Sequence, residues 1–138
     1  MEKTLGLHIL ADLYGVDGSK IDHVEDVKEL LENAVKYANL SKLSSHFHQF
    51  YPQGATGVIL LEESHISIHT WPEHGYAAID VYTCGGKEKT FKAMEYIIKT
   101  LKPKRIDEKV AERGVIPVDQ YLTNIEKLKL EPISVEEK

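Results

Sequence analysis

Two stretches of the chain place apolar residues three and four positions apart, which is the spacing of a helix with one buried face. The first runs from Asp22, a residue type that often caps helices, to about Asn39, and the second covers 88–101. We predict an amphipathic helix in each stretch. The apolar positions are Val24, Val27, Leu30, Leu31, Ala34, Val35 and Ala38 in the first, and Phe91, Met94, Ile97, Ile98 and Leu101 in the second.

The rest of the first 114 residues is typical of short strands, because apolar and alternating segments end at glycine and proline turns. Strand, helix, several short strands, helix and strand follow one another. This order predicts an α+β fold, a two-layer α/β sandwich in which two helices cover one face of a mainly antiparallel sheet. The other face must then meet solvent or a partner. The predicted strands cover 4–14, 42–51, 56–62, 65–71, 76–84 and 104–112.

Two of these strands each put plain apolar side chains on one face and chemically reactive side chains on the other. The purely structural interpretation is an amphipathic sheet with one solvent-exposed face. A merely solvated face would favour Lys, Glu and Thr, however, so histidine, tyrosine and cysteine indicate a functional site. The set is His65, Ser67 and His69 from the first strand and Tyr76, Ala78, Asp80, Tyr82 and Cys84 from the second.

The composition fits one globular domain, because 42% of the 138 residues are hydrophobic and 28% are charged. No apolar run reaches the roughly 18 residues of a membrane-spanning helix. A net charge of −5, with basic residues gathered only at 99–105, argues against nucleic-acid binding. A single cysteine excludes an internal disulfide, and the first residues lack a signal peptide, so we expect a cytoplasmic protein. Residues 125–138 are weakly patterned and predict a tail or a short helix.

Two kinds of chemistry can be tested against the polar face. A metal site is disfavoured, because His65 and His69 lie four apart on a strand, about 13 Å from each other and too far to share one ion. Nucleophilic catalysis fits better. Ser64 lies at the junction of two strands, His69 is a possible base, and Cys84 is a second nucleophile or an acid. A serine and a histidine alone do not decide the matter.

A long continuous run, residues 62–85, carries the most specific signal. It resembles the prokaryotic, pyruvoyl-dependent S-adenosylmethionine decarboxylases. The resemblance extends over about residues 4–114, and we expect a single domain over 1–114 with a C-terminal extension over 115–138. A departure is Thr90, where that family often has proline. The shorter matching stretches are 6–14, 46–50 and 54–58.

The resemblance implies that the chain cuts itself between Glu63 and Ser64. The Ser64 hydroxyl attacks the Glu63 carbonyl, an ester forms by an N-to-O acyl shift, and loss of the Ser64 α-proton eliminates it. The products are a β chain of residues 1–63 and an α chain of residues 64–138 that begins with a pyruvoyl group. His69 is implied as the base in this processing, since a neutral imidazole can take a proton near pH 7.

Further roles are implied in the same way. Thr56, where the family often has serine, is implied as support for the oxyanion during processing. The pyruvoyl carbonyl forms a Schiff base with the α-amine of S-adenosylmethionine and withdraws electrons, so neither a metal nor pyridoxal phosphate is needed. Cys84 then donates a proton to the substrate α-carbon. Phe50 and Trp71 are candidates for contact with the adenine and the sulfonium, and Glu73 for contact with the ribose.

The resemblance also implies that two αβ heterodimers pair, with the active site between protomers, so we expect a dimer of αβ heterodimers here. A polar sheet face independently favours a partner. The implied product is decarboxylated S-adenosylmethionine, the aminopropyl donor for spermidine and polyamine synthesis, released with CO₂. Two alternatives stay open. Some archaeal pyruvoyl enzymes with this scaffold decarboxylate arginine, and a non-enzymatic, histidine-rich metal-binding domain would leave the chain uncut.

Overall fold

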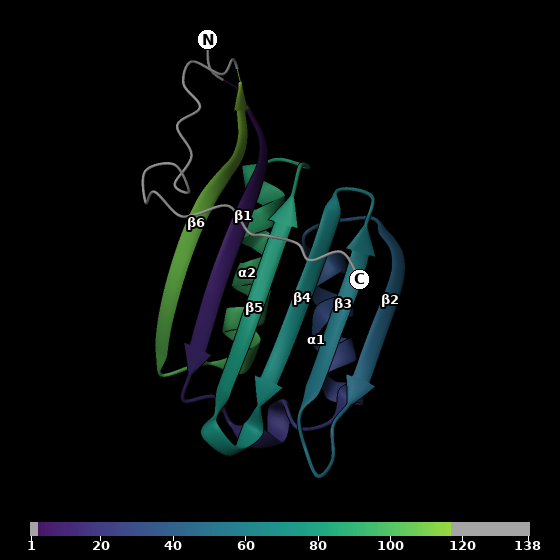
Figure 1. Cartoon of the computed structure of the whole chain (residues 1–138), viewed down its shortest axis with the longest axis vertical. Coiled ribbons are helices and arrows are strands. Elements are labelled where there is room, and N and C mark those ends of the chain that lie inside the picture. The colour runs from purple at the N-terminus through teal and green to yellow at the C-terminus, as the bar shows by residue number, and fades with distance from the viewer. Residues whose placement is uncertain (1–2, 117–138) are drawn as a thin grey trace, which may run out of the picture.

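A six-stranded antiparallel sheet forms the centre of the protein in the computed structural model, which describes residues 3–116 (Figure 1). The strands lie in the order β2-β3-β4-β5-β1-β6, and all neighbouring pairs are antiparallel. The predicted antiparallel sheet is therefore confirmed. In chain order the elements are β1 (Lys3–Tyr14), η1 (Gly18–Lys20), α1 (Val24–Tyr37), β2 (Lys42–Gln49), β3 (Ala55–Leu61), β4 (Ser64–Trp71), η2 (Pro72–His74), β5 (Tyr76–Thr83), α2 (Lys87–Leu101) and β6 (Arg105–Ile116).

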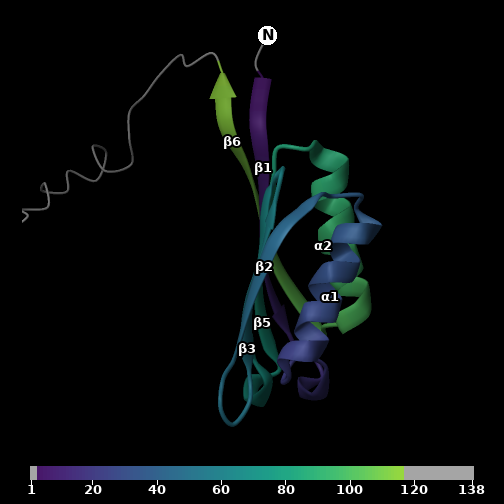
Figure 2. The ribbon, with the colours of Figure 1, turned by 90° about the vertical axis from the view of Figure 1, so that its right-hand side faces the viewer.

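Both α-helices pack on the same face of the sheet, α1 against β2 and β3 and α2 against β1 and β5 (Figure 2). Their apolar faces and the inward side chains of the strands form one core, in which Leu31, Ile66 and Ile97 are fully buried. No other element of residues 3–116 covers the opposite face. The predicted two-layer sandwich is confirmed.

No helix within residues 3–116 is long and apolar enough to cross a membrane. The α-helices α1 and α2 are instead amphipathic, each with buried residues at helical spacing on one side and exposed residues on the other. The cytoplasmic location stays a prediction from the sequence.

The alternation predicted for β4 and β5 is confirmed by burial. Ile66 and Ile68 of β4 and Ile79 and Val81 of β5 are at most 1% exposed. The side chains between them lie partly or fully exposed on the face that the helices leave uncovered. This face carries His65, Ser67, His69, Tyr76, Ala78, Asp80 and Tyr82.

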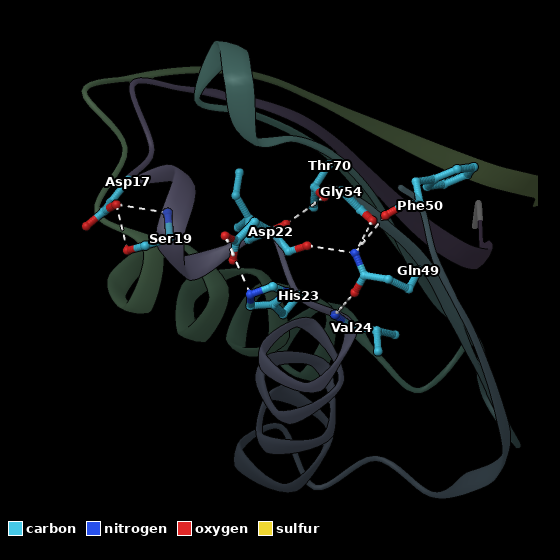
Figure 3. A network of polar contacts seen from close by, with 10 residues as sticks. Asp17, Ser19, Asp22, His23, Val24, Gln49, Phe50, Gly54 and Thr70 are labelled. Carbon is cyan, nitrogen blue, oxygen red and sulfur yellow. Dashed lines mark hydrogen bonds and ion pairs between the residues drawn. The ribbon is translucent and has the colours of Figure 1, made fainter. Parts of the chain in front are cut away.

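The start of α1 differs from the prediction. The helix begins at Val24 and its N-cap residue is His23, so the prediction that Asp22 caps it is wrong. The His23 side chain makes no capping hydrogen bond. The side-chain oxygen of Gln49, at the end of β2, instead accepts a hydrogen bond from the Val24 N–H at 2.6 Å (Figure 3). A residue from a distant strand thus satisfies a free N–H of the first helical turn.

Several strand ends also differ from the predicted ones. β2 ends at Gln49 rather than at residue 51, and β5 ends at Thr83, so Cys84 is the first residue after that strand. β6 continues to Ile116, past the predicted domain end at 114. The predicted tail or helix over 125–138 lies outside the described residues.

Candidate active site

Ser64 lies at a strained corner of the backbone. A two-residue turn joins β3 to β4, and Ser64 is the first residue of β4. Its φ angle is +146°, in a region that residues with a side chain rarely adopt. Such a conformation costs about 1–3 kcal/mol and persists only where the surrounding structure holds it. The strained residue is the one at which the sequence predicts cleavage.

The carbonyl that precedes Ser64 is hydrogen-bonded from a neighbouring loop. The Cys84 N–H donates to the Glu63 carbonyl oxygen at 2.9 Å. An N–H in this position stabilises the negative charge that develops when the carbonyl carbon is attacked. The Glu63 side chain is also held, because its Oε1 accepts a hydrogen bond from the Ser41 N–H at 3.1 Å. Glu63, Ser64 and Cys84 therefore form one group where β4 begins and β5 ends (Figure 1).

Two buried threonines hold the loop that follows β5. Thr83 and Thr90 are at most 1% exposed, and their Oγ1 atoms lie 2.7 Å apart. The Thr90 hydroxyl donates to the Gly86 carbonyl at 3.1 Å, and the Gly85 N–H donates to Thr83 Oγ1 at 3.3 Å. With the Thr90 proton directed at Gly86, the Thr83 hydroxyl supplies the proton between the two oxygens. The pair thus fixes residues 84–86 against the start of α2.

Replacing Thr90 by valine, which keeps the side-chain shape, is expected to lower the free energy of unfolding by about 1–3 kcal/mol, because the buried Thr83 hydroxyl loses its acceptor. Urea unfolding at one fixed protein concentration measures the change. Thr90→Ser keeps the hydroxyl and is the matched control, expected to stay closer to the unmodified protein. Equal stability of the unmodified protein and the valine variant would contradict the assigned hydrogen bonds.

A second group of candidate residues lines a pocket of about 430 Å³. The pocket is formed by the loop after β2, the start of β3 and the end of β4 with the turn that follows it. This volume is in the range of sites that hold small organic molecules. The pocket brings together the three residues predicted to contact substrate and two predicted to act in processing. Its walls include Phe50, Gln53, Thr56, His69, Trp71 and Glu73.

Thr56 and His69 are directly joined in this pocket. They are paired across β3 and β4, and Thr56 Oγ1 lies 3.0 Å from His69 Nδ1. His69 is exposed on the uncovered face of the sheet. When Nδ1 carries the proton and donates it to the threonine oxygen, Nε2 is free to accept a proton. The pair therefore has the geometry of an oriented base.

Trp71 packs against a neighbouring aromatic ring at the pocket wall. The Trp71 ring centroid lies 5.2 Å from that of Tyr76, which in turn lies 5.2 Å from that of Tyr14. The Tyr76 hydroxyl donates to Asp12 Oδ1 at 2.6 Å. Burial, together with this hydrogen bond, raises the pKa of Tyr76 to about 12. Tyr76 thus remains a protonated donor near neutral pH and fixes the ring against which Trp71 packs.

The sequence and the fold are both similar to those of known proteins. A family model described as S-adenosylmethionine decarboxylase matches residues 7–114. The chain is 85% identical over 133 residues to the S-adenosylmethionine decarboxylase proenzyme of Persephonella marina, covering 96% of this chain and 100% of that protein. It is 88% identical over 130 residues to the proenzyme of the same name from a Sulfurihydrogenibium species, covering 94% of this chain and 98% of that one. The chain belongs to the S-adenosylmethionine decarboxylase family.

A solved structure of a member of this family has the same fold. The crystal structure of the adenosylmethionine decarboxylase from Aquifex aeolicus matches with a TM-score of 0.81 and 68% sequence identity, covering 88% of this chain and 99% of that one.

The S-adenosylmethionine decarboxylase family uses a pyruvoyl group. The corner at Ser64 fits a group made from serine, because a strained backbone and a hydrogen-bonded carbonyl meet at that residue. Among residues 3–116, no group of three or more His, Cys, Asp and Glu side chains is arranged to hold a metal ion. The serine and the hydrogen-bonded carbonyl at this corner are what a pyruvoyl group made from serine requires.

A single chain does not bring the two groups of candidate residues together. Ser64 and His69 lie five residues apart on β4, which separates their Cα atoms by roughly 17 Å. β4 begins at the end of the sheet where β5 ends, and it runs to the opposite end (Figure 1). Ser64 and Cys84 therefore lie at the first end, and His69 and the pocket lie toward the second. The sequence names His69 as a possible base for Ser64, and within one chain the two residues are too far apart for direct proton transfer.

Two features of the site are missed by sequence reasoning. The sequence marks 52–54 only as a turn that ends a strand, yet Gln53 lines the pocket. The usable signal is its position, a polar amide in a short turn between the candidates Phe50 and Thr56. The Cys84 N–H at the Glu63 carbonyl is the second feature, and no side-chain pattern reports a backbone donor.

Proposed function

We propose that this chain is a self-processing enzyme that converts S-adenosylmethionine to decarboxylated S-adenosylmethionine and CO₂, with a pyruvoyl group formed from Ser64. The observation that carries the proposal is the corner at this residue, where a strained serine follows a carbonyl held by the Cys84 N–H. The substrate is supported by relatives at 85% and 88% identity that are named for it.

Processing begins when Ser64 Oγ attacks the Glu63 carbonyl carbon, while the Cys84 N–H stabilises the negative oxygen. Breakage of the peptide C–N bond then leaves an ester and releases the strained linkage. Removal of the Ser64 α-proton expels the Glu63 carboxylate. Water then adds at the α-carbon, the amino nitrogen leaves as ammonia, and the pyruvoyl terminus remains. Residues 1–63 and 64–138 stay associated, because β3 and β4 remain hydrogen-bonded neighbours.

His69 is the base that we assign to this processing. Its ring is oriented by the 3.0 Å contact between Nδ1 and Thr56 Oγ1, which leaves Nε2 to accept the proton. The contact gives Thr56 a role in orienting the ring, besides the oxyanion support that the sequence predicts. Because His69 is far from Ser64 of its own chain, it serves the serine of a second copy.

Two copies of the chain complete one site in this proposal. The Ser64 group and the His69 group lie toward opposite ends of one sheet. A two-fold axis that pairs two such sheets places the Ser64 group of each copy over the His69 group of the other copy. One isologous interface then makes two equal sites, in a dimer of αβ units. Exposed apolar side chains on the uncovered face supply surface to bury in such an interface; among them are Leu10, Leu60 and Trp71.

The pyruvoyl group supplies a sink for the electrons of the bond that CO₂ leaves. Binding is assigned to the pocket, where Phe50 and Trp71 present half-exposed aromatic faces to the adenine and the cationic sulfonium. Glu73 accepts hydrogen bonds from the ribose hydroxyls. Cys84, which adjoins the Ser64 corner, returns a proton to the substrate α-carbon. Both S-adenosylmethionine and arginine offer a cation to the aromatic walls, but only S-adenosylmethionine also offers an adenine ring to stack on them.

The purified protein is expected to consist of two chains, one ending at Glu63 and one beginning at position 64, and to release CO₂ from carboxyl-labelled S-adenosylmethionine. Intact-mass spectrometry and trapping of the labelled gas measure the two results. Release from labelled arginine alone would reassign the substrate. One uncut chain that binds zinc and acts on neither compound would favour the histidine-rich binding domain.

A further inference from the structure

Gln49, the last residue of β2, joins three separate backbone segments through its side-chain amide (Figure 3). Its Oε1 accepts a hydrogen bond from the Val24 N–H at 2.6 Å. The two protons of its Nε2 are shared among three carbonyl oxygens, those of Asp22 and Gly54 at 2.9 Å and that of Phe50 at 3.0 Å. One amide therefore connects the start of α1 to both ends of the loop 50–54.

This loop forms one wall of the pocket, through Phe50 and Gln53. It is closed by the Phe50 N–H, which donates to the Gly54 carbonyl at 2.8 Å. It is anchored to the start of α1 by the Gly54 N–H, which donates to the Asp22 carbonyl at 3.1 Å. Gln49 donates to both of these carbonyls, so loss of its amide protons weakens the closure and the anchor together.

Side-chain packing does not fix Phe50. Its side chain is 47% exposed, and its ring meets the edge of the His48 ring, with centroids 4.7 Å apart. The direction of the ring is therefore set mainly by the backbone of the loop. A small displacement of the Phe50 ring is expected to weaken ligand binding, because a binding group contributes only where it meets the ligand in the right geometry.

We propose that Gln49 is a positioning residue for substrate binding, which holds Phe50 in the pocket wall through the loop 50–54. The inference rests on the proposed function, because it takes the pocket as the site of S-adenosylmethionine. The purely structural alternative is that Gln49 only caps α1, in which case it affects stability and not binding.

Gln49→Glu separates these two roles. A carboxylate still accepts from the Val24 N–H, and a negative charge is favourable at the start of a helix. In place of Nε2 it puts an oxygen that has no proton to donate and repels the three carbonyl oxygens, so the loop is released while an acceptor for the Val24 N–H is retained. Gln49→Met loses both roles and is expected to weaken binding to a similar degree and to lower the unfolding midpoint in urea as well.

Binding is measured without turnover, from the fluorescence of Trp71, the one tryptophan of the chain, during titration with 5′-methylthioadenosine. For Gln49→Glu we expect the Kd and the KM for S-adenosylmethionine to rise roughly tenfold, with kcat within about twofold and self-cleavage complete. Asn33→Asp is the matched control, because it makes the same amide-to-carboxylate change further along α1 and outside the pocket. Its Kd should not change.

Phe50→Ala shows whether the effect of Gln49 passes through the ring. In that background Gln49→Glu should change the Kd no further, because an absent ring cannot be misplaced. The inference is overturned if Phe50→Ala weakens binding but Gln49→Glu does not, or if Gln49→Glu weakens binding equally with and without the ring. An unchanged Kd for Phe50→Ala would refute the pocket assignment and this role of Gln49 with it, whereas no turnover of S-adenosylmethionine by the unmodified protein would refute the proposed function itself.

Discussion

Ser64→Ala is expected to yield one uncut chain of 138 residues with no decarboxylase activity. Alanine keeps the backbone pairing of position 64 with Leu61 and Thr83, so the sheet still forms. It has no hydroxyl to attack the Glu63 carbonyl, so neither the ester nor the pyruvoyl terminus arises. The loss is complete rather than partial, because cleavage and the electron-withdrawing group both depend on the same side-chain oxygen.

Intact-mass spectrometry distinguishes the outcomes, one species near 15.6 kDa against two fragments. Ser67→Ala is the matched control, since Ser67 lies on the same strand and its hydroxyl donates to Asp80 at 3.1 Å rather than facing the cleaved bond. We expect that variant to be cut normally. Two fragments from Ser64→Ala would show that the cut site is assigned wrongly.

The layers of the fold follow from local periodicity. Ile66 and Ile68 alternate with His65 and Ser67, and this pattern alone predicts which face of β4 is buried. The prediction holds because a strand turns successive side chains to opposite faces whatever surrounds it. The same reasoning places the apolar faces of α1 and α2, since helical spacing is equally local.

The grouping of the site residues does not follow in this way. Ser64 and His69 belong to one continuous motif, and closeness along the chain suggests closeness in space. A strand rises about 3.3 Å per residue, whereas a helix rises only about 1.5 Å, so the two residues are spread along β4. The motif therefore spans two separate groups of residues, and in the function that we propose a second copy of the chain brings them together.

The cap of α1 is the clearest case of a tertiary contact that overrides a local preference. By residue type Asp22 is a strong capping residue and Gln49 is not. The Val24 N–H nevertheless bonds to Gln49, which the antiparallel sheet brings to the helix start from 25 positions away. Sequence rules for helix capping consider only residues adjacent to the helix end. They cannot predict a hydrogen-bond partner that a distant strand supplies.

Cys84→Ala is expected to cut itself normally and yet to lose roughly 10²–10⁴-fold in kcat, the usual contribution of a positioned acid. The separation follows from the two parts of this residue. Its contact with the Glu63 carbonyl comes from the backbone N–H, which alanine retains. The thiol is assigned only to the later step, the return of a proton to the substrate α-carbon.

Two measurements test this separation, the fraction of cut chain by mass and the release of labelled CO₂ at saturating S-adenosylmethionine. Cys84→Ser is the matched variant, and we expect it to cut normally and to be slow, because a serine hydroxyl is a weaker acid than a thiol. An uncut Cys84→Ala chain would mean that the thiol acts during processing, so that the backbone N–H alone does not suffice at the Glu63 carbonyl. Full activity would remove the thiol from the protonation step, and the proton would then have to come from another group near the Ser64 corner or from water.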